Sequence, residues 1–464
     1  MALVVVATGM MLSVINVTIV NIALPAIARD FGADVSAVGW VVSGFLITQA
    51  TLLLLAGRAG DLFGRRRVFV VGVCVVVVAS ILCALAWSTA SLVAFRIVQG
   101  IGACAMAPTA IGYVAETFPS RERGQAMGIL AGVIGTAPVL ALNLAGVLVG
   151  VFGWRSVFWF SPILGVVVLA GAALVLKPSM PARDREPFDI PGAFLVGVGL
   201  FSILLALSRG EAWGWTSGAT ITAGLVGLVG LKGFLLRERL AEHPMLDMGL
   251  FRLRTVATAN AASLLSSSAL FGSLILLPFY FTVVLGYDEQ RVGLAITPVA
   301  ASFVVVAPLA GRLVHRLGPA RIASTGFALS AVGVLGMALA VPSERYALIL
   351  PGMVAFASGL AMAIAPMNTT AVHEATAERL GVASSLPNIF RYTGGAIGSA
   401  VMLAVLHGRV PEAITRRDGR GSTPERDTFS SGVSVALVVA IVALALAFIV
   451  SRFMPRRLGT EANS

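Results

Sequence analysis

The stretch that decides the fold is residues 57–67, which read GRAGDLFGRRR. A second copy at residues 311–321 reads GRLVHRLGPAR, and both copies follow the pattern G-R-x-x-x-x-x-G-x-x-R. Each copy is basic and follows a long apolar stretch. A basic segment repeated in this setting predicts two similar halves that run in parallel through a membrane. We place the halves at residues 1–176 and 255–464, bridged by a two-helix insert with cytoplasmic flanks at residues 177–254.

The apolar stretches around these motifs are long enough to cross a bilayer. Of the 464 residues, 58% are hydrophobic and only 12% are charged, whereas a soluble domain carries about 25% charged residues. A helix needs about 20 apolar residues to cross the hydrocarbon core. The sequence therefore predicts an all-α membrane protein with about fourteen transmembrane helices, arranged as two six-helix bundles plus two linker helices. The predicted spans lie near residues 3–28, 38–57, 68–87, 91–115, 124–150, 155–176, 191–208, 217–236, 255–285, 290–311, 320–341, 346–372, 381–407 and 430–452.

The basic residues predict how these spans are oriented. The net charge is +11, and arginines collect in the loops on the same side as residues 57–67. Because basic loops remain in the cytoplasm, we expect a multi-pass protein of the plasma membrane with both termini cytoplasmic. The arginines are not gathered on a soluble face, which argues against a nucleic-acid partner. The N-terminus begins almost within an apolar run, so we interpret it as a retained first span.

Further motifs lie in order along the chain. They are NVTIVNIALP at residues 16–25, RIVQGIG at 96–102, GWR at 153–155, DIPG at 189–192, HPML at 243–246 and NIFR at 388–391. Together with residues 57–67, they resemble the major facilitator superfamily over nearly the whole chain. The sequence is most similar to the fourteen-helix drug:proton antiporter branch, the EmrB/QacA type.

This resemblance implies a function and a gate. It implies the major facilitator fold and a secondary active transporter that exports small amphipathic or anionic organic compounds by alternating access, as in drug or antibiotic efflux. It also implies that Gly57, Asp61, Gly64 and Arg65 form a gating motif whose carboxylate binds a helix N-terminus of the opposite bundle. In the second copy His315 replaces the acid, so we expect a weaker latch there. The alternative is that these charges only set the topology.

Two positions depart from the pattern of that branch. Its first-span motif normally begins with aspartate, and here the position is Asn16. Its span-five motif, G-P-x-x-G-G, reads APVLAL at residues 137–142. Asparagine cannot titrate, so a coupling proton would need another carrier. The candidates are Glu116, His373 and Glu374, all toward the cytoplasmic side.

The predicted membrane interior holds two arginines and no carboxylate. Arg96 lies inside span four and Arg391 lies near the middle of span thirteen. An ionisable side chain in lipid is a functional hypothesis, because its burial is costly. One interpretation is that both arginines favour an anionic or hydrogen-bond-accepting substrate in a central cavity. The other is that each is bonded to neighbouring carbonyls and only holds helices in place.

Several polar or aromatic side chains within the spans are candidates for substrate binding or coupling. They are Asn16, Asn21, Trp40, Arg96, Gln99, Tyr113, Asn143, Tyr280, Asn368, Asn388 and Arg391. The three cysteines lie in apolar stretches and the four histidines are scattered, so we predict no metal site and no cofactor. The sequence has no phosphate-binding glycine loop with lysine and no nucleophile elbow, and we predict no enzymatic activity. The expected partners are a small-molecule substrate and membrane lipids, and we expect a monomer.

Two alternatives remain beside efflux. The first is a transporter of the same fold for lipids or metabolites, without proton coupling. The second is a membrane sensor or scaffold that keeps the fold without turnover. The motif residues Arg96, Gln99 and Asp61 argue against the second alternative, whereas Asn16 leaves room for it.

Overall fold

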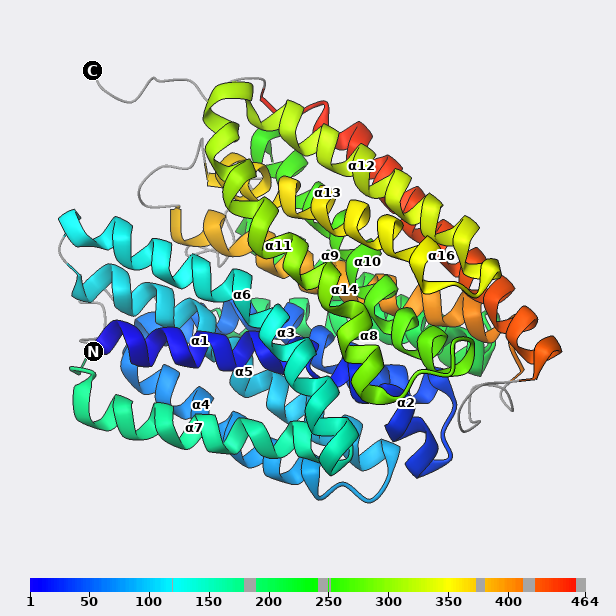
Figure 1. Ribbon diagram of the computed structural model, residues 1–464. Coiled ribbons are helices and arrows are strands. Elements are labelled where there is room, and N and C mark those ends of the chain that lie inside the picture. Colours follow the sequence, from blue (N-terminus) through cyan, green and yellow to red (C-terminus); the bar gives the residue numbers. More distant parts are fainter. Residues whose placement is uncertain are drawn as a thin grey trace.

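The computed structural model is built of helices, and it describes residues 1–118, 120–178, 189–240, 249, 252–372, 380–411 and 422–455 (Figure 1). The helices of the first part are α1 (Ala2–Thr18), α2 (Val20–Phe31), α3 (Val35–Phe63), α4 (Arg65–Ala84), α5 (Thr89–Thr117), α6 (Ser120–Phe152) and α7 (Ser156–Val175). The middle of the chain forms α8 (Ile190–Trp213) and α9 (Gly218–Leu240). The last part forms α10 (Arg254–Val283), α11 (Glu289–Leu317), α12 (Pro319–Ala340), the 3₁₀ turn η2 (Val341–Ser343), α13 (Tyr346–Val372), α14 (Leu380–His407) and α16 (Thr423–Ser451).

Each predicted apolar stretch overlaps a helix, and many of these helices can cross a membrane. In the described residues, 11 helices are long and apolar enough to span a bilayer, or up to 12 when the bent pair α1 and α2 counts as one span. Helices α6 and α8 do not meet that criterion over their described residues, where only the shorter apolar segments Leu140–Phe152 and Phe194–Leu207 are recognised. The all-helical membrane class is confirmed, while the predicted count of fourteen spans is not confirmed over the described residues.

The glycine shared by the two sequence repeats makes the turn between two consecutive helices. Gly64 separates α3 from α4 with a φ of 92°, and Gly318 separates α11 from α12 with a φ of 83°. A side chain rarely tolerates this conformation, whereas glycine adopts it without steric cost. A single residue therefore reverses the chain at the same place in each half.

The first span is broken near its middle. Helices α1 and α2 meet at Ile19 with a bend of 44°. Pro25 lies within α2 and removes a backbone donor from the helix that follows the break. The Asn21 side-chain Nδ2 donates to the Thr18 carbonyl at 3.1 Å, which satisfies an acceptor beside the break. Asn21 therefore has a local structural partner.

The helices form two groups that pack through equivalent glycines. Helices α1–α7 pack with one another, and α10–α14 pack with α16. In the first group, Gly72 of α4 lies directly against Gly102 of α5. In the second group, Gly326 of α12 lies against Gly359 of α13. Because α4 and α12 each follow one copy of the repeated motif, this correspondence supports the internal repeat. Small residues let membrane helices approach closely.

The two groups meet along two lines of contact. Helix α3 packs against α14 and α6 packs against α11, while α2 reaches α10 and α11. At the end of the molecule where α2 lies, Gly146 of α6 touches Gly293 of α11. At the same end Arg29 of α2 forms an ion pair with Glu289 of α11. We call this the outer end, since the charge distribution predicts that it faces away from the cytoplasm.

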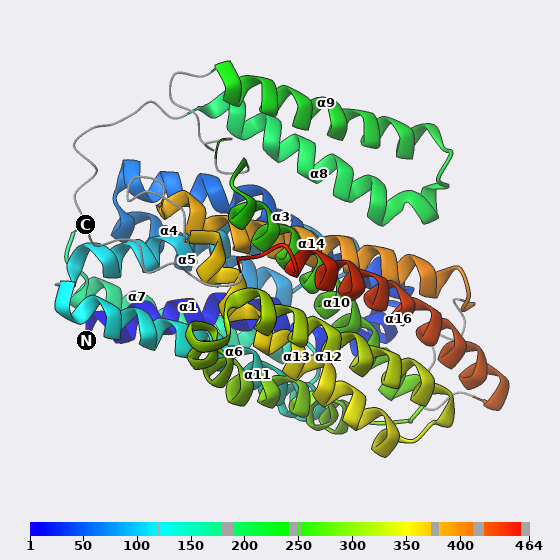
Figure 2. The same cartoon turned by 90° about the horizontal axis from the view of Figure 1, so that it is seen from above.

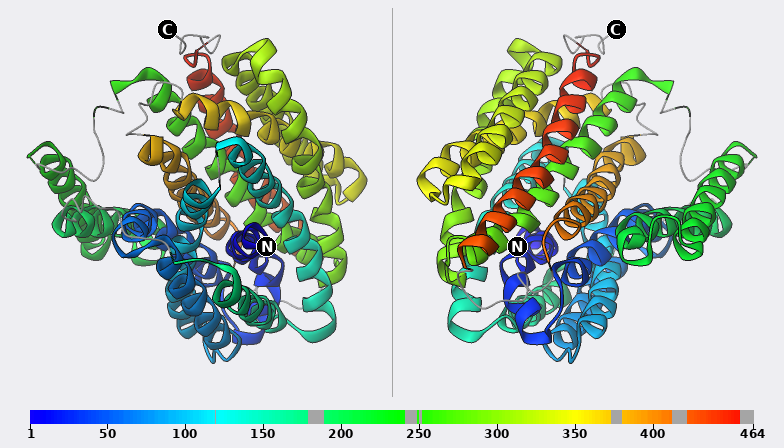
Figure 3. Two further views of the ribbon diagram at one scale, coloured as in Figure 1. Left: turned by 90° about the vertical axis from the view of Figure 1, so that its left-hand side faces the viewer. Right: turned by 90° about the vertical axis from the view of Figure 1, so that its right-hand side faces the viewer.

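Helices α8 and α9 form a hairpin beside the two groups (Figures 2 and 3). Gly199 of α8 and Gly230 of α9 bring the two backbones into contact. The Asp189 side chain accepts from the Gly192 amide at 3.0 Å and pairs with Arg237 of α9 at 3.1 Å. The DIPG motif thus caps the start of α8 and ties it to α9. Helix α8 packs against both α3 and α14.

Candidate functional site

Arg96 is enclosed among the helices of the first group. Its side chain is 0% exposed. Its Nε donates to the Val41 carbonyl at 3.0 Å, and both terminal nitrogens donate to the Asn16 carbonyl at 3.1 Å. The guanidinium also donates to the Gln99 side chain and lies 4.1 Å from the centre of the Phe45 ring. Helices α1, α3 and α5 therefore supply all of its recorded partners.

Asn16 and Gln99 continue this network to two more helices. Gln99 Nε2 donates to Asn16 Oδ1 at 2.9 Å and to Ser80 Oγ at 2.6 Å. Ser161 Oγ also donates to Asn16 Oδ1, at 2.8 Å. Asn16 Nδ2 donates to the Leu12 carbonyl at 2.8 Å. We call Asn16, Ser80, Arg96, Gln99 and Ser161 the Arg96 network, which joins α1, α4, α5 and α7 and, through Val41, α3.

The geometry of the Arg96 network decides between the two interpretations of Arg96. Its guanidinium is bonded to carbonyl and amide oxygens of the protein and has no exposed surface. Such an arginine holds helices together, since its donors already have acceptors. The structure therefore favours the structural interpretation for Arg96 and places no substrate-facing charge there in this conformation.

Arg391 has a different environment. It lies on α14, a helix that packs against both α3 of the first group and α10 of the second. Its side chain donates to Asn388 Oδ1 one turn earlier, and its guanidinium carbon lies 5.5 Å from the centre of the Tyr392 ring. Arg391 and Asn388 are both partly exposed. Arg391 thus keeps surface for a further acceptor.

Three aromatic candidates have structural partners. The Tyr113 hydroxyl accepts from the Lys177 amide at 2.9 Å, so it holds the segment after α7. The Tyr280 hydroxyl is buried and donates to the Val341 carbonyl at 2.8 Å. Trp40 faces the hairpin, where Arg209 of α8 lies 5.2 Å from the centre of its ring. Each of the three side chains thus has a partner within the protein, and their role in lining a central cavity stays a prediction.

The remaining polar candidates are spread over different places. Asn143 Oδ1 accepts from Thr297 Oγ1 at 2.9 Å, which links α6 to α11 between the two groups. Asn368 of α13 is exposed. Glu116 is exposed at the end of α5. His373 and Glu374 lie outside the described residues, so their proposed role as proton carriers stays a prediction.

The gating motif packs within its own group of helices. Arg65 donates to the carbonyl of Gly112 on α5. Gly57 and the neighbouring Gly60 face Pro108 and Thr109 of α5. The side chain of Asp61 lies outside the described residues. The bond from Arg65 to Gly112 therefore stays within the first group, and the latch across the two bundles stays a prediction.

Asn260 was not among the candidate residues predicted from the sequence. This residue lies on α10, is 1% exposed, and donates from Nδ2 to the Val256 carbonyl at 2.9 Å. Its Oδ1 has no hydrogen-bond partner within the described part of the chain, and neither does the Nε2 of Gln49 on α3. A lone amide in an apolar span was the available signal, because burial of such a group is costly.

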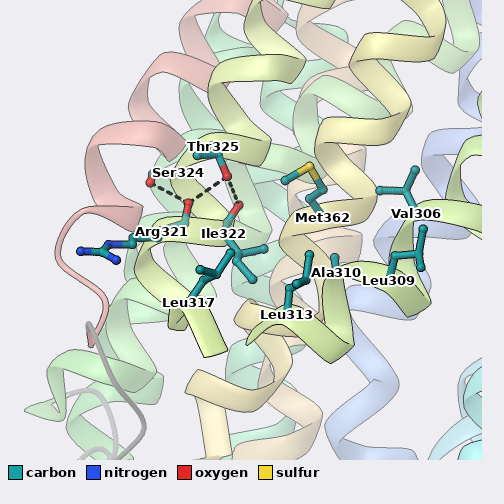
Figure 4. A pocket seen from close by; sticks show the side chains of 10 residues that line it. All are labelled: Val306, Leu309, Ala310, Leu313, Leu317, Arg321, Ile322, Ser324, Thr325 and Met362. Carbon is teal, nitrogen blue, oxygen red and sulfur yellow. Dashed lines mark hydrogen bonds between the residues drawn. The ribbon is translucent and has the colours of Figure 1, made fainter. Parts of the chain in front are cut away.

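The described residues contain an apolar cavity and no group of three metal-ligating side chains. The cavity has a volume of about 370 Å³ and is lined by α11, α12 and α13, among them Leu313, Ile322 and Met362 (Figure 4). Arg321 contributes to its wall, but its guanidinium points away from the aliphatic side chains (Figure 4). This cavity therefore offers no charged group to a ligand.

Known proteins similar to this chain share its helical plan. Residues 6–399 match the family described as Major Facilitator Superfamily. The tetracenomycin C resistance and export protein of Streptomyces glaucescens is 30% identical over 419 residues, which cover 90% of this chain and 78% of that protein. The multidrug resistance protein Stp of Mycobacterium tuberculosis is 32% identical over 500 residues, which cover 99% of this chain and 93% of that protein.

The fold likeness extends to solved structures. A bacterial homolog to the human lysosomal transporter Spinster, in an inward-facing and unoccupied conformation, has a TM-score of 0.70 at 15% identity and covers 98% of this chain and 97% of its own. A D-xylose–proton symporter has a TM-score of 0.69 at 15% identity. The match covers 98% of this chain and 97% of the symporter. At this identity the likeness concerns the fold. The family match covers most of the chain and describes membrane transporters, not enzymes. This multi-pass membrane chain therefore belongs to the Major Facilitator Superfamily.

Proposed function

We propose that this protein exports small amphipathic or anionic organic compounds, in the manner of a drug or antibiotic efflux transporter. The relatives described above are named for resistance and export, and a third, the multidrug transporter protein MdtP of Bacillus subtilis, is 30% identical over 414 residues, covering 88% of this chain and 75% of that protein. The motifs support the fourteen-helix antiporter branch, in which α6 and α8 would also cross the membrane. The proposal includes a monomer in the plasma membrane with both termini cytoplasmic, and halves at residues 1–176 and 255–464 joined by 177–254.

One observation carries the anionic part of this proposal. Arg391 is partly exposed on a helix that contacts both groups, and its recorded hydrogen bond goes to neutral Asn388. The carboxylates of the described helices lie within about one or two turns of a helix end. A fixed positive charge with no carboxylate beside it among the described helices favours an anionic substrate, because the substrate itself supplies the opposite charge.

The membrane potential is sufficient to drive such export. An anion that leaves a negatively charged cytoplasm gains about 2.3 kcal/mol per charge for each 100 mV. Asn16 cannot carry a proton, and its amide is bonded within the Arg96 network. We therefore favour potential-driven export of an anion over proton exchange at Asn16.

The energy source can be tested in proteoliposomes loaded with an anionic dye such as carboxyfluorescein. We expect export to continue when nigericin collapses the pH gradient, and to fall at least tenfold when valinomycin and potassium collapse the potential. The fluorescence of the released dye reports the rate. Export that stops with the pH gradient while the potential persists contradicts potential-driven transport, and no export of any anionic dye contradicts the anionic substrate class.

Alternating access requires the outer end to open, and one ion pair joins the two groups there. Arg29 and Glu289 are both about one-quarter exposed and belong to α2 and α11. Two other ion pairs at the same end stay within one group, Arg155 with Asp30 and Arg426 with Glu344. Breaking the Arg29–Glu289 ion pair removes a contact that forms only when the outer end is closed. The other two ion pairs persist when that end opens, because both partners of each pair belong to one group.

Glu289→Gln should therefore shift the protein toward the outward-open conformation. A partly exposed ion pair contributes up to about 1 kcal/mol, so the ratio of open to closed molecules should rise about fivefold. Spin labels at positions Ala33 and Arg291, on opposite groups, would report the change as a larger fraction of molecules with a long distance between the labels. Glu344→Gln is the matched control and should leave the distribution unchanged. An equal shift in both variants contradicts the role of the Arg29–Glu289 ion pair in closing the outer end.

A further inference from the structure

Two buried amides have atoms without hydrogen-bond partners in the described part of the chain. Gln49 on α3 and Asn260 on α10 are each 1% exposed. Within the described residues, no partner is recorded for Gln49 Nε2 or for Asn260 Oδ1. A buried polar atom without a partner lowers stability, because it has lost its bonds to water. One explanation for such an atom is that another molecule supplies the missing bond.

The packing of α10 on α14 places Asn260 at the depth of Arg391. A side chain at Gly394 would meet Leu264, and one at Gly398 would meet Ser268, so the two helices advance in the same direction. Ser268 Oγ donates to the Gly394 carbonyl at 2.8 Å, which fixes this register. Asn260 lies one turn before Leu264, and Arg391 lies about one turn before Gly394. The two side chains therefore originate at one level of the helix pair.

The packing of α3 on α14 places Gln49 at nearly the same depth. Gly39 of α3 lies against Leu403 of α14 at the outer end, and the helices run in opposite directions from there. Gln49 comes ten residues after Gly39, and Thr393 comes ten residues before Leu403. Both positions are thus about 15 Å from that contact, and Thr393 is two residues from Arg391.

We propose that Gln49, Asn260 and Arg391 form one substrate-binding layer around α14. Arg391 supplies paired donors for a carboxylate or another anionic group. Asn260 Oδ1 accepts a hydrogen bond from the substrate, and Gln49 Nε2 donates one to it. The layer is suited to an anionic organic molecule that also carries a hydroxyl or amide donor and a carbonyl acceptor. Because the partners come from both groups of helices, the substrate would contact both. The inference rests on the proposed export function and adds two specificity-determining residues to it.

The amides of the Arg96 network provide a contrast within the same chain. Asn16 and Gln99 are as deeply buried as Gln49, yet each bonds to several neighbours. The protein therefore satisfies buried amides where they hold helices together. We assign a different role, binding, to Gln49 and Asn260, because their amides have atoms without a partner among the described residues and lie at the depth of Arg391.

The test replaces each amide with an apolar side chain of similar size, Gln49→Met and Asn260→Leu. We expect an unchanged or higher melting temperature in detergent, because each variant removes an unpaired buried atom. Binding of carboxyfluorescein, followed by fluorescence polarisation, should weaken about fivefold in each variant. Ser330→Ala is the control, since Ser330 is buried and donates to the Phe356 carbonyl at 2.9 Å. It should lower the melting temperature and leave binding unchanged.

Each outcome decides a separate point. A melting temperature that falls in Gln49→Met and Asn260→Leu as it does in Ser330→Ala overturns the inference, because the amides would then be structural. Unchanged dye affinity in both variants also overturns it, while export by the unaltered protein would still support the proposed function. Absence of dye binding and of export in the unaltered protein contradicts the proposed function and the layer together.

Discussion

Arg391→Gln should reduce export of an anionic substrate at least thirtyfold. The variant keeps a polar side chain of similar reach but removes the charge, and a hydrogen bond to a charged group contributes about 2 kcal/mol, which corresponds to about a thirtyfold change in affinity. Arg391 is partly exposed and its recorded hydrogen bond goes to Asn388. Its loss therefore affects the substrate more than the fold. Initial rates of dye export from proteoliposomes measure the effect.

Two controls separate the role of charge from that of structure. Arg391→Lys keeps the charge without the planar pair of donors, so it should retain partial export. A neutral dye of similar size should be exported at the same rate by the unaltered protein and by Arg391→Gln. If Arg391→Gln exports carboxyfluorescein at the normal rate, Arg391 does not select an anion and the substrate class must be revised.

Asn16→Asp should make export respond to the pH gradient. Asn16 Nδ2 donates to the Leu12 carbonyl, while its Oδ1 accepts from Gln99 and Ser161. A protonated aspartic acid can reproduce all three bonds, since its hydroxyl takes the place of the amide donor. An ionised aspartate loses the donor but gains attraction to the Arg96 guanidinium. The two protonation states therefore favour different arrangements of the Arg96 network.

The expected result is a rate that changes at least tenfold when the pH gradient across proteoliposomes is collapsed at constant potential, whereas the unaltered protein changes little. Asn16→Leu removes the amide without adding a titratable group, so it should weaken the Arg96 network and leave export independent of the gradient. An Asn16→Asp protein whose transport and pH response match those of the unaltered protein shows that proton coupling was not lost at this site.

Much of the architecture could be predicted from the sequence. Apolar stretches of spanning length form helices because a backbone in lipid must satisfy its own hydrogen bonds. The repeated motif at residues 57–67 and 311–321 predicted two similar halves, but not the equivalent turns that Gly64 and Gly318 make with positive φ. The break between α1 and α2 at Ile19 was not predicted, and α6 and α8 did not meet the spanning criterion over their described residues.

The candidate site was harder to predict, since a membrane helix is apolar on nearly every face. The pattern of side chains then gives little indication of which face is internal. For example, the sequence did not indicate that Trp40 packs against Arg209 or that Tyr280 bonds to the Val341 carbonyl. Asn260 was overlooked, because its unpaired oxygen becomes evident only when the neighbouring helices are in place.

The sequence by itself determined that this protein has many apolar helices, a repeated basic motif and two arginines in predicted spans. These are properties of composition and spacing, which persist whatever the helices contact. Only the tertiary structure decided that Arg96 is bonded to Val41 and Asn16 of other helices while Arg391 keeps exposed surface. The physical reason is that a buried charge is stabilised by acceptors from several helices, and their positions depend on how those helices pack.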